Sequence, residues 1–237
     1  METSSKLASN NPGRGAWLAL TAALLGWMFD GAEMGVFSLV SRPAIQDLMS
    51  RQASFVAMTK PQQEQHIALW LGVITALFLV GAATGGVLFG WLGDRIGRVR
   101  AMTLSVLTYA IFTSLCGVVT APIQLGVLRF IASLGMGGEW SLGVALVMEV
   151  WPNRSRAFMA GLIGAAANVG YLMVSLVSLG LVTFILRVRT LLLDVGLSQS
   201  WVDHLTANQG WRLMMVLGIA PALLTFFIRL FVPESEK

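Results

Sequence analysis

The stretch "IALWLGVITALFLVGAATGGVLFGWLG", Ile67 to Gly93, decides the fold because it runs for 27 residues without an Asp, Glu, Lys or Arg. A helix needs about 20 apolar residues to cross roughly 30 Å of hydrocarbon. Two further runs, 101–128 and 157–186, are also free of charged residues and long enough. The sequence therefore predicts an integral membrane protein.

Composition agrees with that interpretation. Charged residues make up 12% of the chain, hydrophobic residues 56%, and the mean hydropathy is +0.74, whereas soluble domains carry about 25% charged residues. Lipid leaves no partner for free backbone N–H and C=O groups, so the spans should be helices. The short alternating segments of a transmembrane barrel are absent from the sequence.

Six spans fit the pattern and define the predicted fold class, an all-α integral membrane protein. They cover residues 16–40, 67–92, 101–120, 123–149, 157–186 and 211–232. Residues 1–15 are then an amino-terminal tail, residues 16–232 a six-helix transmembrane domain, and residues 233–237 the start of a central loop.

Few residues offer other chemistry. Cys116 is the only cysteine, and the two histidines, His66 and His204, lie at or in predicted loops. This argues against a disulfide framework, a metal site or a cofactor. Without a nucleophile–base pair or a nucleotide-binding loop, an enzyme is not expected. The pI near 9.8 fits the positive-inside rule better than nucleic-acid binding.

The distribution of Lys and Arg predicts the orientation. With the amino terminus inside, nine fall on the inner side and six on the outer side. The short loops between spans two and three and between spans four and five carry five of the nine, and short loops dominate orientation. We expect a multi-pass protein of the inner (plasma) membrane with both termini in the cytoplasm.

Four charges are concentrated in "GWLGDRIGRVR", Gly90 to Arg100, between two of the most apolar runs. This stretch resembles the signature loop of the major facilitator superfamily, G-x-x-x-D-R-x-G-R-x-R, in the same loop between spans two and three. In that family the loop is a cytoplasmic gate. The resemblance implies a gating role for the matching residues, which are Gly90, Asp94, Arg95, Gly97, Arg98 and Arg100.

Two other stretches extend the resemblance over the whole chain. "LRFIASLGMGGEWSLGVALVMEVWPNRSR", Leu128 to Arg156, resembles helix 4 and the following loop of the sugar and metabolite proton symporters, and "VPES", Val232 to Ser235, resembles their motif after helix 6. The resemblance implies a cytoplasmic charge network of Glu149, Arg156 and Glu234.

Ionisable residues inside spans are costly and are functional candidates by default. Four stand out here, Asp30, Glu33, Arg129 and Glu139. Asp30 lies about 21 Å along its span from Ala16, and Arg129 about 10 Å along its own from Pro122. Those depths agree within about one turn, so the sequence allows an Asp30–Arg129 pair, with Glu139 too far along for a direct contact.

These charges have two interpretations. They could pair only to hold helices together, or a carboxylate could release its proton on one side of the membrane and regain it on the other. In the resembling symporters, an acidic residue of helix 1 and an arginine of helix 4 couple transport to protons. The resemblance therefore implies that Asp30 and Arg129 have this coupling role.

The substrate follows less directly from the sequence. Sugar porters carry glutamines in helix 5 where this chain has Gly164 and Tyr171, which disfavours a sugar. "DGAE", Asp30 to Glu33, resembles the D-G-x-D of aromatic-acid symporters, so an anionic metabolite is favoured, with Arg129 as a partner for its carboxylate. Asn168 and Tyr171 are further candidates, and Asn168 could equally face a neighbouring helix.

A glycine pattern predicts close helix packing. Gly81, Gly85, Gly86 and Gly90 place two small-xxx-small motifs on the second span, which suits a tight helix–helix contact.

The resembling family builds a transporter from two six-helix halves. We therefore expect a fragment of a longer protein, a half that pairs with a second chain, or a product that transports nothing. The expected partners are the lipid bilayer, a small-molecule substrate, protons and the other half. The alternative function is a non-transporting membrane scaffold or sensor that retains the fold.

Overall fold

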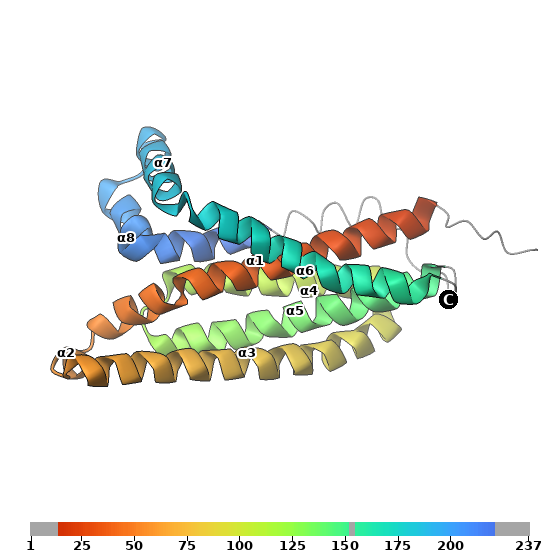
Figure 1. Cartoon of the computed structure of the whole chain (residues 1–237), viewed down its shortest axis with the longest axis horizontal. Helices are drawn as coiled ribbons and strands as arrows, with labels where there is room; N and C mark the ends of the chain where they lie inside the picture. The colour runs from red at the N-terminus through yellow and green to blue at the C-terminus, as the bar shows by residue number, and fades with distance from the viewer. Residues whose placement is uncertain (1–13, 152–154, 221–237) are drawn as a thin grey trace, which may run out of the picture.

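The computed structural model describes residues 14–151 and 155–220, and within these ranges it is helical and contains no strand. Long helices lie side by side in an elongated bundle (Figure 1). The helices are α1 (Arg14–Ser50), α2 (Ala53–Val56), α3 (Lys60–Ile96), α4 (Arg98–Leu115), the 3₁₀ turn η1 (Cys116–Val118), α5 (Pro122–Val150), α6 (Arg156–Ser178), α7 (Leu181–Asp194), α8 (Gln199–Val216) and the 3₁₀ turn η2 (Leu217–Ile219).

Five of the described helices are long and apolar enough to cross a membrane, namely α1, α3, α4, α5 and α6. Helices α1 and α3 each have 37 residues, or about 55 Å at 1.5 Å per residue, so each extends well past a ~30 Å hydrocarbon layer. The predicted sixth span, 211–232, is described only as far as residue 220.

The predicted span 157–186 is interrupted. Helix α6 ends at Ser178, and α7 begins at Leu181 after a break at Leu179 and Gly180. Glycine is a poor helix former, and packing further on holds α7 away from the α6 axis: Ile185 is buried and Arg189 pairs with Asp203 of α8 at 2.7 Å. Figure 1 shows α7 and the start of α8 projecting from one end of the bundle.

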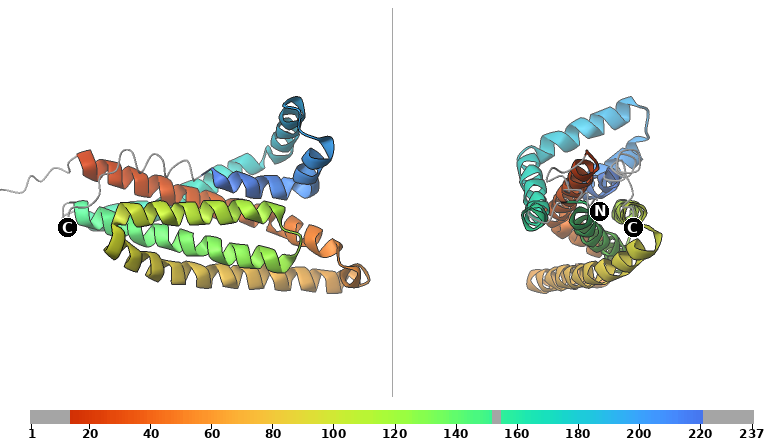
Figure 2. Two further views of the ribbon diagram at one scale, coloured as in Figure 1. Left: turned by 180° about the vertical axis from the view of Figure 1, so that it is seen from behind. Right: turned by 90° about the vertical axis from the view of Figure 1, so that its right-hand side faces the viewer.

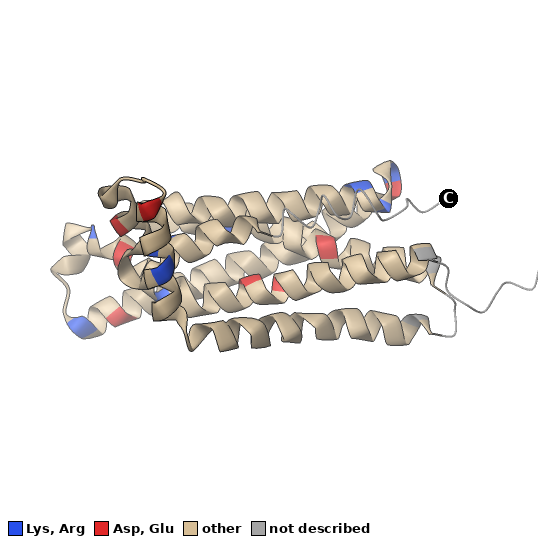
Figure 3. Cartoon of the chain, turned by 90° about the horizontal axis from the view of Figure 1, so that it is seen from above, with Lys and Arg blue, Asp and Glu red and all other residues tan. Residues whose placement is uncertain are grey.

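The two ends of the bundle have different constructions. At one end, the Gly97 end, α3 turns directly into α4 through Gly97, whose φ of +99° is a left-handed value that favours glycine. At the other, the α2 end, lie α2, η1, α7 and the start of α8 (Figure 2). Charged residues gather at these two ends, and a few lie between them (Figure 3).

The predicted glycine contact is confirmed. A Cβ added at Gly85 would run into the backbone of Leu134, and one added at Gly81 would meet Ser133 and Phe130, all on α5. Gly86 and Gly90 also face α5. The small residues of α3 thus let the two backbones approach closely.

Candidate functional site

The four intramembrane charges lie in the interior of the bundle. Asp30 and Glu33 of α1 and Arg129 and Glu139 of α5 are all buried, at 0%, 6%, 1% and 2% exposure. Asp30 and Glu33 are three residues apart, so one face of α1 carries both. The structure therefore brings together the four residues that the sequence singled out on charge alone.

Arg129 forms an ion pair with Glu33, through Nη1 and Oε1. Its guanidinium also lies over the ring of Phe37 at 4.0 Å and that of Phe78 at 4.8 Å, so aromatic faces enclose the cation. Thr113 of α4 donates its hydroxyl to the same Glu33 oxygen at 3.3 Å. Three helices, α1, α4 and α5, thus meet at Glu33.

The Asp30–Arg129 pair that the sequence allows does not form, because the partner of Arg129 is Glu33. The prediction compared the two depths across a ~30 Å layer, whereas α5 has 29 residues and is about 43 Å long. Counted from their ends near Gly97, Glu33 lies about 28 Å along α1 and Arg129 about 31 Å along α5, with Asp30 at only about 24 Å. Glu33, one turn further on, is therefore level with the arginine.

Asp30 and Glu139 remain without ion-pair partners among the described residues. Both carboxylate oxygens of each are buried and accept no hydrogen bond there, and the buried Tyr109 hydroxyl of α4 is also unpartnered within the described ranges. A Cβ added at Gly26 of α1 would overlap the Glu139 carboxylate. Glycine at this position thus lets α1 pack directly against that acid.

A small cavity of about 120 Å³ adjoins Glu33 and Thr113. Apolar side chains of α1, of the end of α8 and of η2 form most of its wall, namely Phe29, Ala32, Val36, Met214, Met215 and Leu217. The cavity gives the ion-paired carboxylate a space beside it, and α8 determines the shape of one wall.

The two candidates on α6 are exposed, unlike the four buried charges. Asn168 is exposed on the surface of α6. Tyr171, also exposed, lines a second cavity of about 290 Å³ between α1 and α6, together with Gly35, Ser38, Leu39, Val174, Ser175 and Ser178. The hydroxyls of this cavity give it a more polar wall than the one beside Glu33.

At the Gly97 end, the motif residues form a compact network centred on Arg98. Its guanidinium contacts Asp94 at 2.6 Å and Glu149 of α5 at 3.1 Å, and donates to the Gly90 carbonyl at 3.3 Å. Arg95 lies over the Trp91 ring at 4.2 Å, while Arg100 is exposed. The motif therefore ties the α3–α4 turn to the end of α5.

The predicted charge network consists of Glu149, Arg156 and Glu234. The structure describes the side chain of Glu149 alone among these three, and that side chain contacts Arg98. Arg156 begins α6, but its side chain lies outside the described residues, and so does Glu234. In the described ranges, no group of three or more His, Cys, Asp or Glu residues could hold a metal ion.

Several site residues were not found from the sequence. Thr113 and Tyr109 share a face of α4 at i,i+4 spacing, but uncharged polar residues in a span are common and gave no signal. Gly26, Phe37 and Phe78 contact the charged residues only through helix packing. These contacts depend on how the helices are aligned in the folded bundle, which the sequence alone does not give.

Comparison with known proteins agrees with the fold and the motif. The family model "Sugar (and other) transporter" matches residues 18–237. Among curated relatives, a Haemophilus influenzae protein named for metabolite transport is 31% identical over 93% of this chain and 44% of its own length. The cis,cis-muconate transport protein of Acinetobacter baylyi is 31% identical over 92% of this chain and 43% of its own.

The gentisate transporter of Corynebacterium glutamicum is 28% identical over 92% of this chain and 41% of its own. A crystal structure of a bacterial homologue of the human lysosomal transporter Spinster, inward-facing and unoccupied, has a TM-score of 0.71 and 22% identity, covering 95% of this chain and 45% of that one. This chain spans about half the length of the curated relatives it matches, and it corresponds to their amino-terminal half. The chain belongs to the sugar (and other) transporter family of the major facilitator superfamily.

Proposed function

We propose that this chain is the amino-terminal half of a secondary active transporter that carries a small organic anion together with protons. The observation that carries the proposal is the set of buried charges on α1 and α5, in which two carboxyls lack partners among the described residues and a third pairs with Arg129. Such groups inside a membrane typically mark proton relays or ion pathways.

The Glu33–Arg129 pair supports a simple coupling scheme. A proton that binds Glu33 removes the negative charge that holds Arg129. The guanidinium then becomes available to a carboxylate of the substrate, for which arginine offers two parallel N–H donors. One proton and one carboxylate thus enter together, and when the anion leaves, Glu33 loses its proton and pairs again with Arg129.

Asp30 and Glu139 fit a proton path that leads to this pair. Asp30 lies one turn from Glu33 on the same face of α1, and Gly26 brings α1 against Glu139. A merely structural role would leave these two acids paired, because an unpaired buried charge is expensive. Asp30, one turn from the ion pair, and Glu139, further along the bundle beside Gly26, therefore favour proton exchange.

The relatives favour an anion. Muconate and gentisate, which two of the relatives are named for transporting, both carry carboxylates. A substrate of this class suits Arg129, whereas the helix 5 positions at which sugar porters carry glutamine hold Gly164 and Tyr171 here. A sugar is therefore the weaker candidate.

We further propose that the Gly97 end faces the cytoplasm of a cell with this protein in its inner membrane, with both termini inside. The Arg98 network would then be a cytoplasmic gate that joins this half to a second six-helix half, in the same or another chain. Asn168 and Tyr171, exposed on α6, are proposed to line the path of the substrate.

Uptake into membrane vesicles tests the proposal. Vesicles that contain the native product are given labelled cis,cis-muconate or gentisate under an imposed pH gradient. We expect gradient-driven uptake that a protonophore abolishes, loss of gradient dependence in Asp30→Asn with insertion intact, and no effect of Glu64→Gln, an exposed carboxylate on α3. Wild-type pH dependence in Asp30→Asn would remove Asp30 from the mechanism.

The Glu33→Gln variant tests the coupling scheme separately. It should still bind muconate, because Arg129 is freed from its carboxylate, but the binding should no longer release or take up protons. If wild-type vesicles neither bind nor accumulate either anion, the alternative of a non-transporting scaffold or sensor gains support.

A further inference from the structure

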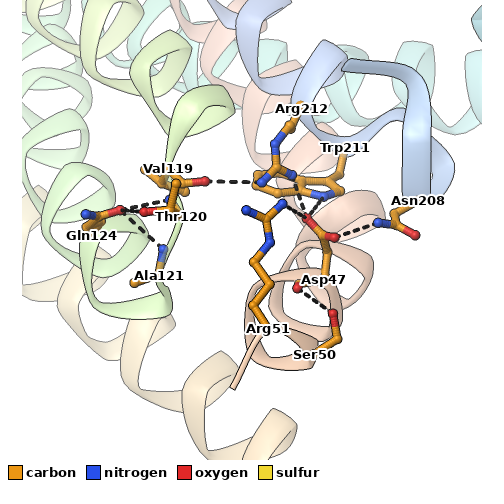
Figure 4. Close-up of polar contacts among 10 residues, drawn as sticks. All are labelled: Asp47, Ser50, Arg51, Val119, Thr120, Ala121, Gln124, Asn208, Trp211 and Arg212. Carbon is orange, nitrogen blue, oxygen red and sulfur yellow. Dashed lines mark hydrogen bonds and ion pairs between the residues drawn. The ribbon is translucent and has the colours of Figure 1, made fainter. Parts of the chain in front are cut away.

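A second, partly buried charge cluster lies at the α2 end, outside the site described above. Asp47, near the end of α1, accepts hydrogen bonds from Asn208 Nδ2 at 2.7 Å, Trp211 Nε1 at 3.2 Å and Arg212 Nη1 at 2.6 Å (Figure 4). Arg51 adds a longer contact at 3.6 Å. We name these five residues the Asp47 hub.

Arg212 connects the hub to the turn between α4 and α5. It is buried, and its Nη2 donates to the carbonyl of Val119, just after η1, at 3.2 Å (Figure 4). The hub therefore joins three parts of the chain that are far apart in sequence, namely the end of α1, the turn between α4 and α5, and the segment of α8 that follows its break.

The backbone at the hub is strained. Helix α8 is broken at residues 207–210, where Asn208, Gln209 and Gly210 all have positive φ, of 50°, 62° and 64°. Positive φ is unfavourable for Asn and more so for Gln, and it persists where surrounding contacts fix it. The hydrogen bond from Asn208 to Asp47 is one such contact, so the hub fixes the break and the direction of the helix after it.

The hub also sets the rotation of α8 about its axis. Three side chains of α8 converge on one carboxylate, so the helix cannot turn without breaking at least one of these hydrogen bonds. Neighbouring contacts leave little freedom: a Cβ added at Gly117 would meet the Arg212 carbonyl and Val216, and one added at Gly218 would meet Thr113. A small rotation would therefore move side chains along the whole inner face of α8.

Met214 and Met215 lie two and three residues after Arg212 and line the cavity beside Glu33 and Thr113. We propose that Asp47 is a positioning residue: through Arg212 and Asn208 it fixes the rotation of α8 and so holds the α8 wall of the Glu33 cavity in place. The part of the inference that concerns substrate rests on the proposed function, whereas the position of α8 does not.

Cys116, the only cysteine, is a natural reporter of that position. It is buried in the same apolar cluster as Trp211, Met214 and Met215. A small maleimide should label it slowly in the native protein. In Asp47→Ala we expect labelling at least about tenfold faster, the factor that corresponds to loss of one hydrogen bond to a charged group. Asp47→Asn, which keeps one acceptor oxygen, should be intermediate.

Matched controls separate local movement from unfolding. Arg51→Ala removes only the longest and most exposed contact of the hub and should label like the wild type. A second reporter, Ala101→Cys, is buried in a separate cluster near the Gly97 end and, with Cys116 replaced by Ser, should stay unlabelled in the Asp47→Ala background. Faster labelling of Cys116 alone supports the inference. Labelling of both reporters, or of Cys116 no faster than in Arg51→Ala, overturns it.

Uptake provides a readout tied to the site. If vesicles accumulate muconate, Asp47→Ala should raise the apparent KM several-fold, because the cavity wall has moved, and Arg51→Ala should leave it unchanged. An unchanged KM in Asp47→Ala together with faster Cys116 labelling would overturn the link to the Glu33 cavity. If neither the wild type nor its variants accumulate muconate, the proposed function fails. The Cys116 labelling result still decides whether Asp47 positions α8.

Discussion

The buried Glu33–Arg129 pair gives a prediction that can be checked against a second Glu–Arg pair in the same protein. Glu33 and Arg129 have side chains only 5% and 2% exposed, whereas Arg42 and Glu64 form a pair with both side chains 53% exposed. Replacing Glu33 by Gln leaves a buried arginine without its counter-charge, and breaking a buried pair in this way costs about 3–5 kcal/mol. Replacing Glu64 by Gln should cost about 1 kcal/mol or less.

The comparison translates into thermal stability. For chains of this size, 1 kcal/mol shifts Tm by roughly 2–4 °C, so Glu33→Gln should lower the Tm of the purified protein in detergent by about 6–20 °C and Glu64→Gln by no more than about 4 °C. The carboxamide of Gln can still accept the Thr113 hydrogen bond, so the loss reports mainly the charge.

A double variant tests the same reasoning from the opposite direction. Glu33→Leu with Arg129→Met replaces both charges by apolar side chains, and such exchanges are often neutral or stabilising. Its Tm should therefore lie above that of Glu33→Gln. If Glu33→Gln is no less stable than Glu64→Gln, the burial argument is refuted, and Glu33 is not held as a charged partner of Arg129.

Three further predictions concern single contacts. Gly26→Ala places a methyl group against the Glu139 carboxylate and should lower Tm by several degrees. The control, Gly72→Ala on α3, adds a Cβ that meets nothing within 4 Å and should be neutral or stabilise by up to about 1 kcal/mol. Equal Tm values for the two variants would show that α1 does not pack on Glu139. At the break in α8, Gln209→Gly should relieve strain at positive φ and stabilise the protein by up to about 1 kcal/mol. Asn208→Gly also relieves strain but loses the hydrogen bond to Asp47. Its Tm should therefore lie below that of Gln209→Gly. Arg98→Gln loses its contacts to Asp94 and Glu149, so it should lower the free energy of unfolding by about 1–3 kcal/mol. Arg100→Gln, at an exposed position, should lower it by less than about 0.5 kcal/mol. A larger loss in Arg100→Gln than in Arg98→Gln would contradict the network at the Gly97 end.

The membrane-spanning fold follows from the sequence alone, for a physical reason that needs no tertiary information. A run such as Ile67–Gly93 has no charged residue, and in lipid a helix satisfies its own backbone hydrogen bonds. The glycine face of α3 is equally local, because its spacing of four residues places Gly81 and Gly85 on one side of the helix. Intramembrane charge also identifies Asp30, Glu33, Arg129 and Glu139 as candidates, since such residues are costly there.

The partners of those charges depend on tertiary structure. Asp30 and Glu33 have the same helical face and similar depth. The pairing of Arg129 with Glu33 follows from the length of α5 and from how α1 and α5 are aligned in the bundle. The break after Ser178 depends in the same way on packing, because Ile185 and Arg189 of α7 are held by α8 and not by neighbours in sequence.

The Asp47 hub shows the limit most clearly. Asp47 and Arg212 are 165 residues apart, and each, read in sequence, is a single charge near the end of a helix. Only folding brings Asn208, Trp211 and Arg212 to one carboxylate and holds Asn208 and Gln209 at positive φ. Local sequence determines which segments enter the membrane, because hydrophobicity and helical period are properties of a single segment. Tertiary structure determines which buried charges meet, because that depends on the register between segments, which no single segment contains.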